Sequence, residues 1–583
     1  MIEDKHRVIR INARAGSGKT TTLRMLATGN TSARILYLVF NRKAREEAQA
    51  TFLSNVDVHT VHSLAYRYEG YKWGKLKDLS PADLLPAFRR TNEPQLLARI
   101  TCDFLLFIMN SPLEQLEHAA AGFKRMLPDE AQSIFKRNQA EVIRCARQAA
   151  TDWYRGNKPC PHDFYLKLFH KSGEFYRVLD SYDMILADEA QDLSEVMTDA
   201  LGASRKRIVI VGDSHQQIYG FRYAIDAMQR LSSDREYELT LSFRFGKPIA
   251  DLAILFVREA KGDNAFRIEG NPGVLSRITQ REIPPVRNCA ILSRTNLSLF
   301  STAVGLRSRG IRYRFERDID KVLWQTLDVY WLAQREKRKI RSDWIRSFES
   351  MESLERYADN CDDFQVKSIV RIVRRHAADF PHIIFEMNGM SRKDTGETDP
   401  HRVVLSTIHV SKGQEYARVF MDPDVADTLT ATEKLDGVKS KEEANVAYVG
   451  FTRAAEHPFL PASFQDLLSD RWKDFLQGFT STKKVSRASN PPLLYGSSER
   501  RTSSSHGNTK SGRYGSAASR AGYRETWNRQ SNELAERTRP KIGDRVATFR
   551  GSGTVVEISG ELCFVDLDGQ IGRLWERLSN LKH

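Results

Sequence analysis

The chain of 583 residues is long enough for three or four domains, and its 41% hydrophobic content is enough for ordinary cores. Lys and Arg number 89 against 74 Asp and Glu, and the net charge of +15 suits a polyanionic partner, although a solvated basic surface would give the same count. No apolar run reaches the ~18 residues of a membrane span, the N-terminus lacks the apolar core of a signal peptide, and the six cysteines include no CxxC pair. These features argue against a membrane protein, a secreted protein and a zinc or iron–sulfur site, and we expect a soluble, intracellular, cytoplasmic protein.

The N-terminal third alternates short, mostly apolar runs with helical stretches. The runs are Val8–Asn12, Ile35–Phe40, Met184–Ala187 and Ile208–Val211. Helical segments follow the first two, and apolar strands separated by helices predict a parallel sheet covered on both faces. Between about Tyr66 and Asp180 the pattern is helical and charged, which indicates an inserted helical subdomain.

A second α/β region begins near Cys289, resumes at Arg402 and ends near Phe459. The segment between, roughly residues 332 to 390, is mostly helical in pattern. From about 481 to 539 the chain is rich in Ser, Gly and Arg. Such a segment has too few apolar residues to bury enough surface, and this burial cannot offset the conformational entropy lost on folding. We therefore expect a disordered basic linker there. Strand alternation and turn glycines return from 542 to 578 and predict a small β-barrel.

A phosphate-binding loop is indicated by the run Ala13-Arg-Ala-Gly-Ser-Gly-Lys-Thr20, which follows a predicted strand and precedes a predicted helix, Thr21–Thr28. The glycines let backbone N–H groups turn toward phosphate oxygens, and the helix N-terminus adds its positive dipole. Lys19 can reach the β- and γ-phosphates, and Thr20 can ligate Mg²⁺. The strand–loop–helix context makes a chance match a poor explanation.

A second chemical feature is the acidic end of the strand Tyr182-Asp-Met-Ile-Leu-Ala-Asp-Glu-Ala-Gln-Asp192. Asp188 is placed to hold Mg²⁺, and Glu189 is placed to polarise an attacking water. Taken alone, the carboxylates are equally consistent with a solvated acidic loop that caps the next helix. The phosphate loop on the same predicted sheet favours the metal interpretation.

With these runs, the chain resembles superfamily 1 helicases of the UvrD/Rep type, and within them the F-box DNA helicases most closely. The resemblance covers about residues 8 to 460 and includes, after the phosphate loop, Phe40-Asn-Arg-Lys-Ala44, His59-Thr-Val-His-Ser-Leu-Ala65, the acidic run 188–192 and Val211-Gly-Asp-Ser-His-Gln-Gln-Ile-Tyr-Gly-Phe-Arg222. It continues with Leu241-Ser-Phe-Arg-Phe-Gly-Lys-Pro248, Ser293-Arg-Thr-Asn296, Ser406-Thr-Ile-His-Val-Ser-Lys-Gly-Gln-Glu415 and Glu442-Glu-Ala-Asn-Val-Ala-Tyr-Val-Gly-Phe-Thr-Arg-Ala454.

The resemblance implies a role for individual residues. The catalytic positions are Lys19, Glu189, Gln216, Arg244 and Arg453. The positions implied to contact ATP are Ala15, Gly16, Ser17, Gly18, Lys19, Thr20, Thr21, Phe243, Arg244, Gly413, Glu415 and Arg453, and those implied to hold Mg²⁺ are Thr20 and Asp188. The positions implied to contact DNA are Phe40, Asn41, Thr60, His62, Phe221 and Arg222. Taken alone, Phe221 is as well explained by core packing, and Arg244 and Arg453 by surface ion pairing.

The expected architecture is α/β, with two RecA-like P-loop motor domains, helical insertions and a small C-terminal SH3/Tudor-like β-barrel. The expected parts are a first motor domain (1–65 and 181–275) with a helical insertion (66–180), a second motor domain (276–331 and 396–465) with a reduced helical insertion (332–395), the basic linker (481–539) and the barrel (540–583). The family carries a glutamine upstream of the phosphate loop that reads adenine. No Gln precedes Ile11 here, so the sequence leaves open whether ATP is preferred over GTP. No F-box sequence precedes the motor region, so the resemblance does not imply a ubiquitin-ligase role for this chain.

The resulting expectation is an ATP-dependent DNA helicase or translocase that acts on single-stranded DNA and tailed duplexes in repair or recombination. The resemblance implies 3′-to-5′ movement, and the barrel is a candidate docking site for a protein partner. Two alternatives stay open at this point. One is an ATPase motor subunit of a nuclease or anti-phage defence complex, and the other is a DNA-binding ATP switch that does not unwind.

Overall fold

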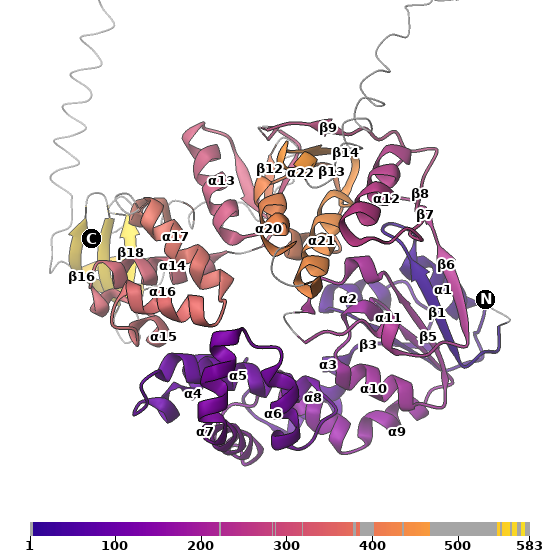
Figure 1. Cartoon of the computed structure of the whole chain (residues 1–583), viewed down its shortest axis with the longest axis horizontal. Coiled ribbons are helices and arrows are strands. Elements are labelled where there is room, and N and C mark those ends of the chain that lie inside the picture. The colour runs from indigo at the N-terminus through magenta and orange to yellow at the C-terminus, as the bar shows by residue number, and fades with distance from the viewer. Residues whose placement is uncertain are drawn as a thin grey trace, which may run out of the picture. The chain divides into compact units, whose positions relative to one another are not determined.

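The computed structural model describes residues 4–466, apart from 221–222, 283, 286, 318, 377–379, 385–386, 388–401 and 434–436, together with four strands between 545 and 577. The chain divides into two compact units, Met1–Phe479 and Thr480–His583. Both sheets that carry the sequence motifs lie in the first unit (Figure 1). No helix among the described residues is both long and apolar enough to cross a membrane.

The first sheet is wholly parallel, with the strand order β3-β2-β4-β5-β1-β6. Its strands are β1 (Val8–Ala13), β2 (Ile35–Val39), β3 (Val56–Thr60), β4 (Met184–Ala187), β5 (Arg207–Gly212) and β6 (Arg235–Leu239). The four apolar runs expected as strands are therefore strands, and β2 and β4 are buried at every position. Because all six strands are parallel, their carboxyl ends meet at one edge, where ligands bind in sheets of this kind.

Helices flank the first sheet, as expected for continuous apolar strands. They are α1 (Lys19–Thr28), α2 (Arg42–Gln49), α3 (Val61–Tyr68), α10 (Glu195–Ala203), α11 (Ala227–Arg230) and the single turns η3 (Ala190–Asp192) and η4 (Ser214–Gln216). Helix α1 begins at Lys19, two residues before the expected start. Its Leu23 and Leu26 pack against strand residues such as Ile11, Tyr37 and Val209 in one core.

The segment between α3 and β4 is helical, as its charged, helix-like pattern predicts. It contains η1 (Gly70–Lys72), α4 (Pro81–Leu84), η2 (Leu85–Phe88), α5 (Pro94–Asn110), α6 (Leu116–Lys124), α7 (Asp129–Tyr154), α8 (His162–Lys171) and α9 (Glu174–Asp180). Helices α5, α6 and α7 meet around three buried rings, Phe104, Phe123 and Phe135, whose centroids lie 5.2 to 6.0 Å apart. This aromatic cluster gives the segment a core of its own.

The second sheet is also parallel, in the order β11-β12-β10-β13-β14-β9. Its strands are β9 (Thr279–Gln280), β10 (Ala290–Ser293), β11 (Tyr313–Phe315), β12 (Val403–Thr407), β13 (Tyr416–Met421) and β14 (Ala454–Leu460). The helices beside it are α13 (Asn296–Ser308), α19 (Ile408–Ser411), α20 (Pro423–Glu433), α21 (Gly437–Phe451) and α22 (Ser463–Asp466). Two parallel sheets with flanking helices fit two RecA-like motor domains.

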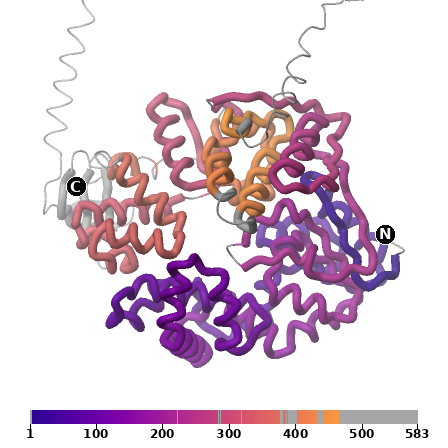
Figure 2. Tube along the Cα trace, viewed as in Figure 1, coloured from indigo at the N-terminus to yellow at the C-terminus, as the bar shows by residue number. Residues whose placement is uncertain are grey.

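Between β11 and β12 the described residues form α14 (Asp320–Ala333), η6 (Lys337–Lys339), α15 (Asp343–Arg346), α16 (Met351–Asn360) and α17 (Phe364–His376). Figure 2 shows α14 to α17 gathered in one group, in salmon. The strands β7 (Leu241–Ser242) and β8 (Glu269–Gly270) pair in a short two-stranded sheet, and α12 (Lys247–Lys261) lies between them in the chain. Helix α12 shares its core with the second sheet, since its Phe256 packs against Phe451 at a ring-centroid distance of 5.5 Å.

In the second unit, an antiparallel sheet runs in the order β15-β16-β17-β18. The strands are β15 (Arg545–Thr548), β16 (Gly551–Ser559), β17 (Leu562–Leu567) and β18 (Arg573–Arg577). The expectation of a closed barrel built on these strands stays a prediction. The predicted linker at 481–539 lies outside the described residues.

Candidate active site

The loop between β1 and α1 is shaped by two glycines in the left-handed region. Gly16 has φ 72° and Gly18 has φ 79°, values that residues with side chains rarely adopt. Space is limiting at Gly16, where an added Cβ would lie 2.6 Å from Ser242 Oγ and 2.7 Å from Arg244 Cβ. The most crowded position of the loop therefore has no side chain, which lets the backbone N–H groups approach a phosphate closely.

The other loop residues also fit a bound phosphate. Ala15 is fully buried, and Ser17 is buried with no hydrogen-bond partner for its hydroxyl in the described part of the chain. A buried hydroxyl without a partner is unfavourable, and a phosphate oxygen would supply one. Thr21 lies in the first turn of α1 and is exposed to solvent.

Lys19 at the start of α1 forms an ion pair with Glu189 at the end of β4. The two atoms, Lys19 Nζ and Glu189 Oε1, are 2.9 Å apart. Burial opposes the lysine charge, but the carboxylates of Glu189, Asp188 and Asp213 outweigh burial and raise the pKa of Lys19. Lys19 is thus a fixed cation with acidic groups on one side and the phosphate loop on the other.

The expected magnesium ligands are adjacent. Thr20 Oγ1 donates to Asp188 Oδ2 at 3.3 Å, and the Tyr37 hydroxyl donates to the same oxygen at 2.7 Å. Burial raises the pKa of Asp188, and the neighbouring charge of Glu189 adds to this effect. A hydroxyl and a buried carboxylate at the mouth of the phosphate loop are oxygen donors of the kind Mg²⁺ prefers, so the residues fit that ion. Tyr37 was not expected from the sequence, because the residue lies inside a strand.

Glu189 adopts an uncommon backbone conformation. Its φ is 51°, in the left-handed region, which costs a residue with a side chain about 1 to 3 kcal/mol. The side-chain amide of Gln191 donates to the Glu189 carboxylate, and Gln191 Oε1 accepts from the Asp213 backbone N–H at 3.1 Å. Strain held by such a network at a strand end is typical of functional sites.

Gln216 and Arg453 bring the second sheet to this site. Gln216 Nε2 donates to Asp213 Oδ2 at 2.9 Å, and Arg453 Nη2 donates to Gln216 Oε1 at 3.3 Å. Arg453 follows α21 of the second sheet and is only 2% exposed. Burial and the nearby charge of Arg244 lower the pKa of Arg453 to about 9, so its guanidinium is still protonated at neutral pH. The second sheet thus places a buried cation, Arg453, beside Gln216 of the first.

Arg244 lies beside the phosphate loop and contacts the second sheet as well. Its Nη1 donates to the Thr452 carbonyl at 2.9 Å, and its Nη2 is 2.7 Å from Glu415 Oε1. Gly413, in the same motif as Glu415, has φ 88°. The structure therefore brings Arg244, Glu415 and Arg453 together, as the resemblance implies.

Phe243 presents its ring to solvent over the phosphate loop. Its backbone N–H donates to the Gly16 carbonyl at 2.8 Å, and its side chain is 62% exposed. A Cβ on Gly18 would lie 3.6 Å from the ring. An exposed phenyl ring beside a phosphate loop is suited to stack on a base.

Lys412 is a site residue that the sequence reasoning missed, although it lies in the quoted motif 406–415. The side chain reaches from the second sheet to the first, where Nζ pairs with the Asp192 carboxylate and donates to the Gln216 carbonyl at 2.7 Å. Its partners are 220 and 196 residues away in the chain, so no local pattern indicates them.

The residues expected to contact DNA are only partly gathered. Phe40, just after β2, is 37% exposed and stacks on Tyr219 with ring centroids 5.2 Å apart. Tyr219 also donates to the His409 carbonyl at 3.1 Å, and neither Tyr219 nor His409 was expected as a contact. Phe221 and Arg222 lie outside the described residues.

Three further members of that set have local structural contacts. Asn41 caps α2 by accepting from the Ala44 N–H at 2.9 Å, and Thr60 caps α3 by accepting from the Ser63 N–H at 3.1 Å. His62 lies 3.0 Å from Asp163 of α8. These contacts explain why the residues suit their positions, and their role toward DNA stays a prediction.

Two family models match the chain. An AAA domain model covers residues 2–222, and a UvrD-like helicase C-terminal domain model covers residues 334–462. These spans include the phosphate loop and the acidic strand end in one model, and Lys412, Glu415 and Arg453 in the other.

The chain is 28% identical to F-box DNA helicase 1 of Gallus gallus over 512 residues, which covers 81% of this chain and 49% of the relative. It is 27% identical to F-box DNA helicase protein 1 of Schizosaccharomyces pombe, covering 78% of this chain and 55% of the relative. The chain therefore spans about half the length of these curated relatives. A solved structure titled "The structure of PRRSV helicase" aligns over 79% of this chain and 54% of that chain at 11% identity, with a TM-score of 0.29. The two family models and the two relatives place the chain among the UvrD-like superfamily 1 helicases, as a relative of the F-box DNA helicase branch.

Proposed function

We propose that this chain is an ATP-dependent DNA helicase or translocase of DNA repair or recombination that moves 3′-to-5′ on single-stranded DNA. One observation carries the proposal. The cation Lys19 beside the first sheet pairs with Glu189 and is affected by the charge of Asp213. Asp213 accepts from Gln216, which in turn accepts from the cation Arg453 beside the second sheet, so both cations lie at a single site. An ATP molecule held there would contact both sheets at once.

Each group at the site has a part in ATP hydrolysis under this proposal. Mg²⁺, held by Thr20 and Asp188, would neutralise charge between the phosphates. Lys19 holds the β- and γ-phosphates, Glu189 orients and polarises the attacking water, and Arg453 stabilises charge on the γ-phosphate. Gln216 contacts Arg453 and thereby couples the first sheet to the second.

Movement follows from this arrangement, because a ligand shifts an equilibrium only by its differential contact with the two states. Arg244, Arg453 and Lys412 all reach across from one sheet to the other. Bound ATP favours closure of the two sheets, and loss of the γ-phosphate removes the contact that Lys19 and Arg453 share. Repeated closing and opening of the two sheets on a bound DNA strand would then move the protein stepwise along that strand.

The DNA side of the proposal is supported by the stacked rings of Phe40 and Tyr219 and by the net charge of +15. Exposed aromatic rings bind any base on its π-face, which a sequence-independent motor needs. The name of each relative, F-box DNA helicase, supports DNA as the substrate. We propose single-stranded DNA and tailed duplexes as the forms bound.

A strand-displacement assay tests the proposal directly. With ATP and Mg²⁺, the chain should unwind a duplex with a 3′ single-stranded tail and leave a 5′-tailed duplex intact, and Lys19→Ala should unwind neither. Displacement from the 5′ tail alone would reverse the proposed direction. ATP turnover that single-stranded DNA fails to stimulate would refute the motor.

We further propose that strands β15 to β18 form an SH3/Tudor-like barrel that docks a protein partner. The support is their antiparallel pairing in sequence order. Removal of residues 540–583 should leave DNA-stimulated ATP turnover intact and abolish capture of that partner. A loss of turnover on removal would assign the segment to the motor instead.

A further inference from the structure

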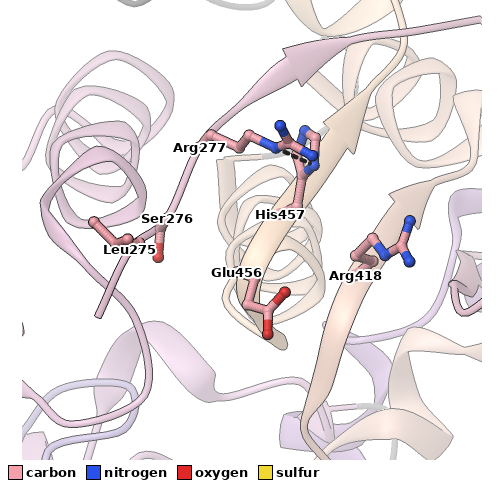
Figure 3. Close-up of a pocket in the computed structure, with 6 residues that line it drawn as sticks. All are labelled: Leu275, Ser276, Arg277, Arg418, Glu456 and His457. Atoms are coloured by element: carbon pink, nitrogen blue, oxygen red, sulfur yellow. Dashed lines mark hydrogen bonds between the residues drawn. The ribbon is translucent and has the colours of Figure 1, made fainter. Parts of the chain in front are cut away.

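A cavity of about 450 Å³ opens at the outer edge of the second sheet, apart from the proposed ATP site. Figure 3 shows its lining, which comes from the segment before β9 and from the neighbouring strands β13 and β14. The lining residues are Leu275, Ser276, Arg277, Arg418, Glu456 and His457. No step proposed above uses any of them.

The guanidinium of Arg277 is held in place by a buried histidine. Arg277 Nε donates to His457 Nδ1 at 2.9 Å, and His457 Nε2 lies 2.7 Å from Thr279 Oγ1. Burial lowers the pKa of His457 to about 4, and Arg277 adds to this effect, so the ring is neutral and accepts at Nδ1. With Nε fixed in this way, the two terminal nitrogens of Arg277 are left as a preorganised fork for an oxyanion.

Arg418 of β13 adds a second positive charge. In the register of the sheet it pairs with His457, so it lies on the same face as the ring that holds Arg277. Within the described residues, neither Arg277 nor Arg418 has a carboxylate within ion-pair distance. Glu456 also lines the cavity, but consecutive strand residues point to opposite faces, which separates it from the face that carries His457. The cavity therefore has two guanidinium groups without a counter-charge.

The remaining lining distinguishes between kinds of anion. The Leu275 side chain is 92% exposed, and a fully exposed leucine gives no favourable contact to a sugar–phosphate chain. A carboxylate with an apolar neighbour would offer a negative charge to the two arginines and an apolar side chain to Leu275.

We propose that this cavity is a docking site for an acidic–apolar peptide segment of a protein partner. An Asp or Glu carboxylate of the partner binds between Arg277 and Arg418, and an adjacent apolar side chain packs on Leu275. A volume of this size holds one or two side chains, as an anchor pocket of a protein interface does.

The cavity is connected to the ATP site through Ser276. Ser276 Oγ accepts from the Gly246 N–H at 2.8 Å and donates to the Ala455 carbonyl at 2.8 Å. Gly246 lies two residues after Arg244, and Ala455 lies two residues after Arg453. A peptide seated in the cavity would thus touch Ser276, which is itself hydrogen-bonded to the backbone segments that follow both arginines of the proposed ATP site.

Selection from a hexapeptide library tests the proposal. The library is randomised among Asp, Glu, Leu, Phe, Ser and Lys and is presented to the full chain. The chain should enrich peptides with an acidic residue next to Leu or Phe. In Arg277→Ala/Arg418→Ala the affinity for an enriched peptide should fall about tenfold or more, since both charge-assisted contacts are lost. The double variant Arg89→Ala/Arg137→Ala, which removes two exposed arginines of the helical segment, should bind like the parent.

Thermal unfolding shows whether the double variant is folded. Should it be unfolded, Leu275→Ser serves instead, because a side chain that is 92% exposed contributes little to stability; it should weaken the peptide about threefold. Absence of acidic–apolar enrichment by the parent, or equal affinity in the parent and the cavity variants, overturns the proposal. Competition with a single-stranded oligonucleotide and with inorganic phosphate tests the other ligands. If either one displaces the peptide and no longer binds to Arg277→Ala/Arg418→Ala, the cavity is assigned to nucleic acid or to free phosphate instead.

Discussion

Arg453 and Gln216 are 237 residues apart in the chain, yet Arg453 Nη2 donates a hydrogen bond to Gln216 Oε1 at 3.3 Å. Arg453 directly precedes β14 of the second parallel sheet, and Gln216 follows β5 of the first. Gln216 is in turn hydrogen-bonded to Asp213, whose charge acts on Lys19. This chain of contacts makes the two sheets share one site.

Substitution of Lys19 tests the phosphate-binding part of that site. Lys19→Ala should lower ATP turnover about a hundredfold or more, because the phosphates lose their main counter-charge. Phosphate release in the presence of single-stranded DNA measures the effect. Lys136→Ala, an exposed lysine on α7, is the matched control and should turn over ATP like the parent. Parental turnover by Lys19→Ala would refute the assignment.

Phe243 should act on ATP affinity more than on the chemical step. Phe243→Ala removes an exposed ring beside the phosphate loop and should raise the KM for ATP up to about tenfold, with kcat within about twofold of the parent. Steady-state kinetics separate the two constants. Phe364→Ala removes a phenyl ring that is 51% exposed on α17 and should change neither. An unchanged KM in Phe243→Ala would assign the ring to a different role.

The stacked pair Phe40 and Tyr219 should serve DNA-dependent turnover. Phe40→Ala should reduce DNA-stimulated ATP turnover about tenfold and basal turnover much less, because stacking on a base is worth about 1 to 3 kcal/mol. Phe221→Ala should behave in the same way. The exposed tyrosine of α7 provides the control Tyr154→Ala, for which both rates should stay at the parental value. Equal losses of basal and stimulated turnover would mean that Phe40 only packs against Tyr219.

Lys412 should couple the sheets without binding the nucleotide. Lys412→Ala breaks the contacts to Asp192 and to the Gln216 carbonyl, and leaves a buried carboxylate without its partner. We expect kcat to fall about tenfold while the KM for ATP changes less than about threefold. Lys321→Ala, at an exposed position of α14, is the control. A rise in KM with unchanged kcat would place Lys412 in nucleotide binding instead.

Local patterns were sufficient to predict the strands that are apolar at nearly every position. β2 and β4 are buried throughout and were expected from their composition alone. β3 and β6 were not singled out, because each contains polar or charged residues at alternate or successive positions. Edge strands such as these are solvated on one side, so the apolar signal that marks a central strand is absent.

Contacts across large sequence separations mark the limit of sequence reasoning at the site. The motifs named Lys19, Asp188, Gln216 and Arg453, and the structure brings them together. Tyr37 donates to Asp188 from inside a strand, 151 residues away, and nothing in the run ILYLV distinguishes this side chain from a core residue. The packing of α12 on the second sheet is likewise absent from any local pattern, because it depends on residues such as Phe451 far along the chain.

The central claim is that one ATP molecule is held from two sides, and Arg453→Ala tests it most directly. Binding of a fluorescent ATP analogue and single-turnover hydrolysis should be measured on the same preparation with saturating single-stranded DNA. We predict binding up to about tenfold weaker, since the phosphate loop is intact but one of the two sides is lost, and hydrolysis about a hundredfold slower or more, since the opposite cation is lost. Hydrolysis at the parental rate in Arg453→Ala would contradict the account.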